Sequence, residues 1–160
     1  MKELFSEREW DLLRKTPAIV LSMVAFADGK FDDKELNAFS TFCSNKDAFR
    51  SELIKLVLPV DLKKYIDEVM PQIDKNTIRD ILREIDVTLD LKANPAEVRA
   101  FKYHLVALGV FIANASGKIF HHNISEDEDE AINKFAKYID IDASQLFKTT
   151  LVDEILQKIK

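Results

Sequence analysis

The sequence predicts an all-α fold, a compact single domain of seven or eight helices over residues 1–160. Three observations indicate it. The chain has only 3 glycines and 4 prolines, too few turn residues for a sandwich of short strands. Apolar residues recur at helical spacing in one segment after another, and no segment alternates between apolar and polar residues. With 47% hydrophobic and 32% charged residues, the composition is that of a globular protein with a substantial core.

Helix-start signals mark the elements of the first half. A capping residue followed three positions later by glutamate starts two helices, at Ser6-Glu9 and Asp32-Glu35. Between them, a helix from Pro17 to Ala27 is expected to end at Asp28-Gly29. Proline and cap signals then predict helices over Asp47–Leu58, over Asp61–Met70, and from Asn76 or Thr77 onward.

The second half is organised around one long helix. The segment Asn94-Pro95-Ala96-Glu97 combines an N-cap, a proline in the first turn and a capping-box glutamate. Apolar residues then repeat at steps of three and four up to Ala115, and Gly117 can end the helix. This should be the central helix. Ser125 and Glu128 start the next helix, and a final helical segment begins at Ser144.

Two parts of the chain resemble each other. The stretch Ala25–Phe31 (AFADGKF) is similar to Ala113–Ile119 (ANASGKI), and a capping-box helix follows each. The sequence therefore predicts two pseudo-symmetric helix–Gly-turn–helix units, at about 17–43 and 105–139, with five extra residues (Phe120–Ile124) in the second. The alternative is convergence on the same capping chemistry, which would reproduce the glycine and the cap but less readily the flanking alanines and lysine.

The first turn carries a family resemblance. The segment Ala27–Glu35 (ADGKFDDKE) resembles the signature turn of the TerB-like tellurite-resistance family, and the likeness extends over most of 17–142. The resemblance implies a compact helical fold of two related units and metal binding through acidic residues. It also implies a role in stress or tellurite resistance alongside other proteins. The second unit departs from the pattern, because Ser116 replaces the expected aspartate and the insertion brings His121 and His122.

Acidic residues around the first glycine turn are candidate metal ligands. Asp28, Asp32 and Glu35 lie within eight residues, and hard cations such as Ca²⁺ or Mn²⁺ prefer several oxygen ligands. An EF-hand alignment fails, because its first and third positions would be the apolar Val24 and Phe26. The alternative is that these acids only cap helix ends.

The insertion in the second unit offers further candidate ligands. His121, His122 and Glu128 combine imidazole and carboxylate groups, which suit Zn²⁺. The alternative is an exposed loop that leads into a solvated helix start. We expect His104 and Cys43 to be structural residues of the core.

Several function classes are disfavoured. A net charge of −5 and a pI near 5.3 argue against nucleic-acid binding. No apolar run reaches the roughly 20 residues of a membrane span. The run Ala18–Ala27 imitates a signal peptide, but the acidic residues before it and its helix signals argue against one.

A single cysteine fits the reducing cytoplasm, where we expect the protein to act. Phosphate-loop, zinc-helix and nucleophile-elbow motifs are missing, which predicts that the chain is not an enzyme.

The sequence thus predicts a non-catalytic, metal-binding, stress-linked scaffold. The metal would be Ca²⁺, Mn²⁺ or Zn²⁺, and the partners would be other proteins. The main alternative is a metal-free acidic module that recognises a basic protein partner. A third reading, an enzyme built on the histidine insertion, would require that His121→Ala abolish an activity without unfolding the protein.

Overall fold

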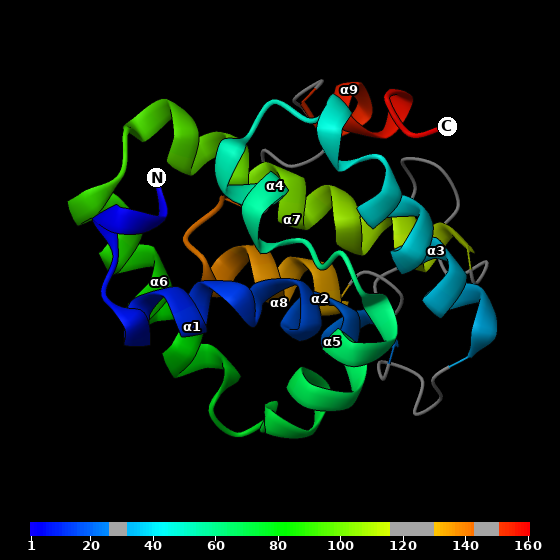
Figure 1. Ribbon diagram of the computed structural model, residues 1–160, viewed down its shortest axis with the longest axis horizontal. Coiled ribbons are helices and arrows are strands. Elements are labelled where there is room, and N and C mark those ends of the chain that lie inside the picture. Colours follow the sequence, from blue (N-terminus) through cyan, green and yellow to red (C-terminus); the bar gives the residue numbers. More distant parts are fainter. Residues whose placement is uncertain (26–31, 116–129, 143–150) are drawn as a thin grey trace.

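The computed structural model describes residues 1–25, 32–115, 130–142 and 151–160, and every regular element in these ranges is a helix (Figure 1). The all-α prediction is confirmed. No helix in this part of the chain is long and apolar enough to cross a membrane. The helices are η1 (Lys2–Leu4), α1 (Glu7–Arg14), α2 (Thr16–Ala25), α3 (Asp33–Ser44), η3 (Lys46–Ala48), α4 (Glu52–Val57), α5 (Leu62–Val69), η4 (Met70–Gln72), α6 (Ile78–Lys92), α7 (Pro95–Ala115), α8 (Glu130–Tyr138) and α9 (Leu151–Gln157).

Helix α7 is the central element, as its apolar pattern predicts. All of residues 101–110 are buried, so this helix is enclosed on every side rather than along one stripe. It packs against α2, α3, α4, α6, α8 and α9, and Figure 1 shows it crossing the middle of the molecule. The buried apolar side chains of the nine α-helices in the described ranges form one continuous cluster that includes those of α7.

The helices of the two predicted units pack across one another. Helix α2 of the first unit contacts α7 and α8 of the second, and α3 of the first contacts α7. In Figure 1 both α2 and α7 end on the right-hand side, so the chain leaves both helices on the same side of the molecule. The pseudo-symmetry itself stays a prediction. The glycine turns of both units lie outside the described residues.

Gly109 of α7 faces side chains of α2 and α8. A Cβ placed on this residue would lie 3.4 Å from Val20, 3.5 Å from Val24 and 3.6 Å from Ile132. These are ordinary van der Waals distances, so the site has room for one methyl group and no more.

We therefore expect Gly109→Ala to raise the free energy of unfolding by about 0.5–1 kcal/mol, because alanine removes the entropic cost of a mid-helix glycine. Gly109→Leu should lower it by about 1–3 kcal/mol through overpacking. Urea unfolding of both variants measures the two effects. If Gly109→Ala destabilised the protein as much as Gly109→Leu, the helices would pack more closely than these distances indicate.

Most predicted helix starts are confirmed. Ser6 and Glu9 form a reciprocal capping box at α1. The side chains of Asp32, Asp61 and Asn94 each accept a backbone N–H in the first turn of their own helix. Local capping chemistry is therefore sufficient to place these boundaries.

Two local predictions are wrong. The segment Asp47–Leu58 is not one helix. The short helix η3 ends before Phe49, whose backbone is extended and whose side chain is 2% exposed. Ser51 then caps a separate helix, α4.

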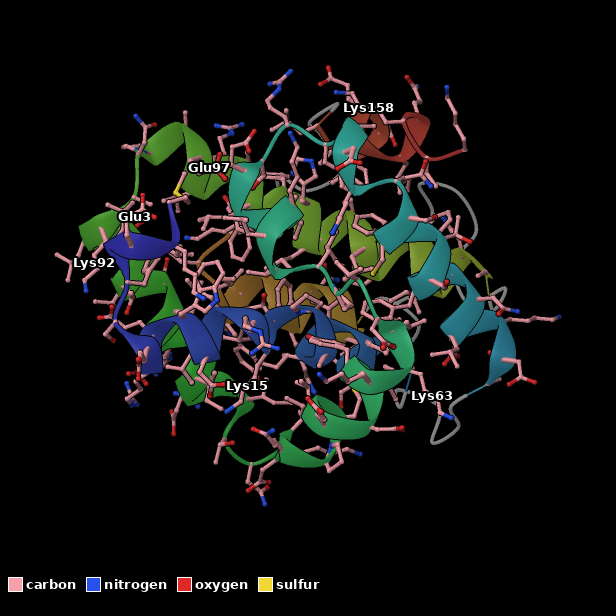
Figure 2. All side chains as sticks on the ribbon, viewed as in Figure 1. Glu3, Lys15, Lys63, Lys92, Glu97 and Lys158 are labelled. Carbon is pink, nitrogen blue, oxygen red and sulfur yellow. The ribbon has the colours of Figure 1, made fainter. Side chains whose placement is uncertain are left out.

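Glu97 does not complete the predicted capping box of its own helix. Its Oε1 instead accepts hydrogen bonds from Ser51 Oγ at 2.6 Å and from the Leu53 amide at 2.8 Å. Figure 2 shows Glu97 beside α4, so this carboxylate joins the starts of α4 and α7.

Candidate functional site

The start of α3 carries the described part of the predicted acidic turn. Asp32 is exposed, and its Oδ1 accepts a hydrogen bond from the Glu35 amide at 2.8 Å. This confirms Asp32 as the N-cap of α3. A capping carboxylate still has free lone-pair positions, so capping does not prevent metal coordination.

Glu35 differs from an ordinary residue at this helical position. It is completely buried, whereas the side chain of Glu9, its counterpart in α1, is 21% exposed and forms an ion pair with Lys92. Burial of a carboxylate is costly unless hydrogen bonds, a cation or a metal ion compensate the charge. Glu35 is therefore a buried carboxylate three residues after the exposed N-cap Asp32.

The other four predicted ligands are not tested by the structure. Asp28, His121, His122 and Glu128 lie outside the described residues, so whether they approach Asp32 and Glu35 stays a prediction. Within the described ranges, no three His, Cys, Asp or Glu side chains gather in a group that could hold a metal ion.

Cys43 and His104 are buried, as expected of core residues. Cys43 is 7% exposed, and burial raises the pKa of its thiol to about 12, so the reactive thiolate is scarce at neutral pH. His104 is 3% exposed and packs on Phe49 with ring centroids 5.2 Å apart.

The protonation of His104 follows from its surroundings. Its Nδ1 lies 2.6 Å from the carbonyl oxygen of Ala100, and because a carbonyl only accepts, Nδ1 carries a proton. Burial lowers the pKa of the ring, and the charges of Lys158 and Arg50 lower it further against opposing effects of Ala100 and Glu97. The imidazole is therefore neutral at neutral pH.

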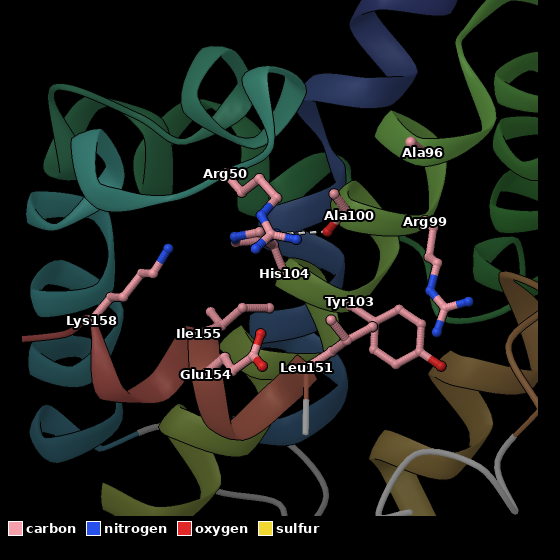
Figure 3. A pocket seen from close by; sticks show the side chains of 10 residues that line it. All are labelled: Arg50, Ala96, Arg99, Ala100, Tyr103, His104, Leu151, Glu154, Ile155 and Lys158. Carbon is pink, nitrogen blue, oxygen red and sulfur yellow. Dashed lines mark hydrogen bonds between the residues drawn. The ribbon is translucent and has the colours of Figure 1, made fainter. Parts of the chain in front are cut away.

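His104 also lines a pocket between α7, α9 and the segment that precedes α4. The pocket has a volume of about 210 Å³ (Figure 3). Its lining combines small and aliphatic residues with three cations and one carboxylate: Arg50, Ala96, Arg99, Ala100, Tyr103, His104, Leu151, Glu154, Ile155 and Lys158. We call this the α7–α9 pocket.

The charges around the α7–α9 pocket are predominantly positive. Arg50, Arg99 and Lys158 stand against Glu154 alone, in a chain whose net charge is −5. In Figure 3 Arg50 overlaps His104 in the view, while Lys158 and Arg99 lie to either side. Arg99 is held over the ring of Tyr103, 5.5 Å from its centroid. The pocket therefore combines an apolar wall with a basic rim.

Comparison with known proteins finds no family model, no curated protein and no solved structure that matches this chain. The TerB-like resemblance of Ala27–Glu35 thus stays a prediction from the sequence.

The α7–α9 pocket is the feature that sequence reasoning missed. Its three cations lie at positions 50, 99 and 158, so no local motif unites them. The one available signal was His104, a titratable residue near the edge of the apolar stripe of a central helix. Neighbours far apart in sequence decide whether such a histidine borders a pocket.

Proposed function

We propose that this chain is a non-catalytic helical module of the TerB type that binds a divalent metal ion at its acidic turn and acts as a scaffold for other proteins. The observation that carries the proposal is the complete burial of Glu35 beside the exposed Asp32. A glutamate that only capped a helix would remain in solvent, as Glu9 partly does. A buried carboxylate that follows the Asp28 turn in the sequence supports a polar site that binds a metal ion in addition to capping α3.

The arrangement of the two units supports a site that they share. Helices α2 and α7 pack together and end on the same side of the molecule (Figure 1). The C-terminal ends of α2 and α7, which precede the acidic turn and the histidine-containing segment in the sequence, therefore lie on the same side. Asp28, Asp32 and Glu35 would supply oxygen ligands, and His121, His122 and Glu128 would complete the set for a metal such as Zn²⁺.

Metal analysis of the purified, untagged protein tests this proposal. We expect one equivalent of a divalent ion, and EDTA-stripped protein should regain thermal stability when Ca²⁺, Mn²⁺ or Zn²⁺ is added. At an ion concentration 100 times the Kd, binding should contribute about 2.7 kcal/mol to the free energy of unfolding. The effect should disappear in Asp28→Asn and Glu35→Gln.

Asp61→Asn is the matched control, because Asp61 caps α5 in the way that Asp32 caps α3 but has no acidic glycine turn before it. It should retain the metal response of the unaltered protein. Absence of any shift with the three ions at millimolar concentration would contradict the metal site and leave the capping role alone.

A metal-free interaction module is the second candidate, and one observation favours it. Helix α6 exposes two aliphatic side chains, Val87 at 58% and Leu91 at 78%, which lie four residues apart and therefore on one face. An acidic surface around such a face would suit a protein partner with basic residues. Partner capture would then be sensitive to salt and to Leu91→Lys, and unchanged by EDTA, Asp28→Asn or Glu35→Gln.

A further inference from the structure

We propose that the α7–α9 pocket binds a small organic carboxylate, with Arg50 as the main anchor for the carboxylate group and the apolar wall of α7 and α9 as the seat for a short hydrocarbon or aromatic group. None of its described lining residues is one of the predicted metal ligands, and its rim has a charge of the opposite sign to those ligands.

The sign of the ligand charge follows from the rim. Among the described residues, three basic side chains and one acidic one line the pocket, although acidic residues outnumber basic ones by 28 to 23 in the whole chain. The local excess of positive charge is therefore a property of this site and not of the composition. One of the lining residues, Ala96, belongs to the first turn of α7, whose N-terminal dipole also favours a negative group.

Arg50 and Lys158 are the two cations near His104. Both side chains are exposed, and both charges lower the pKa of the buried imidazole, that of Lys158 more than that of Arg50. Arg99 is engaged with the ring of Tyr103. His104 is neutral and donates its Nδ1 proton to Ala100, which leaves Arg50 and Lys158 to bind the anion. Of these two, only the guanidinium of Arg50 has paired N–H groups that match a carboxylate.

The wall and the volume define the rest of the ligand. Ala96, Ala100, Leu151 and Ile155 offer no hydrogen-bonding side chains, which favours an apolar group over a fully hydrated anion. The volume of about 210 Å³ is below the roughly 300–1,000 Å³ of pockets that hold drug-sized ligands. A ligand with a short hydrocarbon part therefore fits this pocket better than a drug-sized one.

The test is an NMR titration of the full chain with four probes. Hexanoate should bind saturably, with a Kd of about 1 mM or below, and shift the amide signals of Ala100, His104 and Ile155. Acetate has the charge without the chain, hexylamine has the chain with the opposite charge, and inorganic phosphate is an anion with no apolar part. Each of these should bind at least about tenfold more weakly.

Variants locate the site. Arg50→Gln should weaken hexanoate binding about tenfold, and Ala96→Leu, which narrows the pocket at an exposed position, should weaken it similarly. Arg79→Gln removes an exposed arginine from α6, away from the pocket, and should leave the affinity unchanged. Circular dichroism checks that each variant is folded.

Three outcomes would overturn the proposal. Acetate or phosphate binding as well as hexanoate would show an anion patch with no apolar specificity, and hexylamine binding equally well would show that the cations play no part. Unchanged hexanoate binding in a folded Arg50→Gln would exclude Arg50 as the anchor. None of these outcomes bears on the metal site, which EDTA and Asp28→Asn test independently.

Discussion

Asp86→Ala should lower the free energy of unfolding by about 3–5 kcal/mol, an unusually large effect for a charged residue. Asp86 of α6 accepts a hydrogen bond from the Lys102 ammonium group of α7 at an Nζ–Oδ1 distance of 2.5 Å. Lys102 is only 8% exposed and Asp86 17%, and Lys102 lies in the enclosed stretch of the central helix. Removing the carboxylate leaves a buried ammonium without its counter-charge, which is the costly part.

Urea unfolding and a double-mutant cycle measure this effect. Lys102→Met alone should also destabilise the protein, because Asp86 then keeps a largely buried charge. Combining Lys102→Met with Asp86→Leu should recover most of the loss, since a buried ion pair is often replaceable by apolar residues of similar volume. Glu130→Ala, which breaks the exposed pair with Lys134, is the control and should change stability little. A loss below about 1 kcal/mol for Asp86→Ala would mean that water reaches Lys102.

The helix boundaries that the sequence predicts correctly depend on interactions within one turn. Ser6, Asp32, Asp61 and Asn94 each cap a backbone amide two or three residues ahead, so the signal and its target share one short segment. The central position of α7 was also predictable, because a helix whose apolar stripe is widened on both sides must be enclosed.

The predictions that are wrong depend on contacts between distant residues. Glu97 has the spacing of a capping-box residue, but it bonds Ser51 and Leu53, more than 40 residues away. Phe49 breaks a segment of good helix formers because its side chain enters the core, where it packs on Phe42 with ring centroids 4.7 Å apart. Tertiary packing overrides local propensity at both places.

The same distinction applies to the candidate sites. The acidic turn is visible in the sequence because its residues are consecutive, but the complete burial of Glu35 depends on how α3 packs. The α7–α9 pocket has no sequence signature, because Arg50, Arg99 and Lys158 come from three separate segments. Sites built from one segment are readable from sequence patterns, whereas sites built by packing are not.

After the Asp86–Lys102 pair, Tyr65 makes the second large contribution to the stability of the fold, and sequence patterns do not indicate it. The helix is interrupted between α1 and α2. Pro17 has no backbone N–H, so it cannot donate to the Leu13 carbonyl four residues earlier. That carbonyl accepts a hydrogen bond from Thr16 Oγ1 at 2.7 Å in its place. The next pair of the helical ladder would be Ala18 N–H with the Arg14 carbonyl. The Tyr65 hydroxyl stands between them: it accepts from Ala18 N at 3.0 Å and donates to the Arg14 oxygen at 2.7 Å.

Tyr65→Phe should therefore lower the free energy of unfolding by about 2–6 kcal/mol, because it leaves two polar backbone groups without partners at about 1–3 kcal/mol each. Tyr65 is 5% exposed, so water has little access to replace the hydroxyl. Tyr103→Phe is the matched control, since Tyr103 is similarly buried at 8% and its hydroxyl has no hydrogen-bond partner among the described residues. Its stability should change little.

Hydrogen exchange separates this explanation from a simple loss of packing. In Tyr65→Phe the Ala18 amide should exchange faster by a larger factor than the amides of α7, because its own hydrogen bond is lost in addition to global stability. If Ala18 N–H instead closed directly onto the Arg14 carbonyl, the two helices would join into one straighter helix. The Ala18 amide would then stay protected and the stability loss would fall below about 1 kcal/mol. The hydroxyl would in that case set only the angle between α1 and α2, and α5 would contribute to the shape of the bundle more than to its stability.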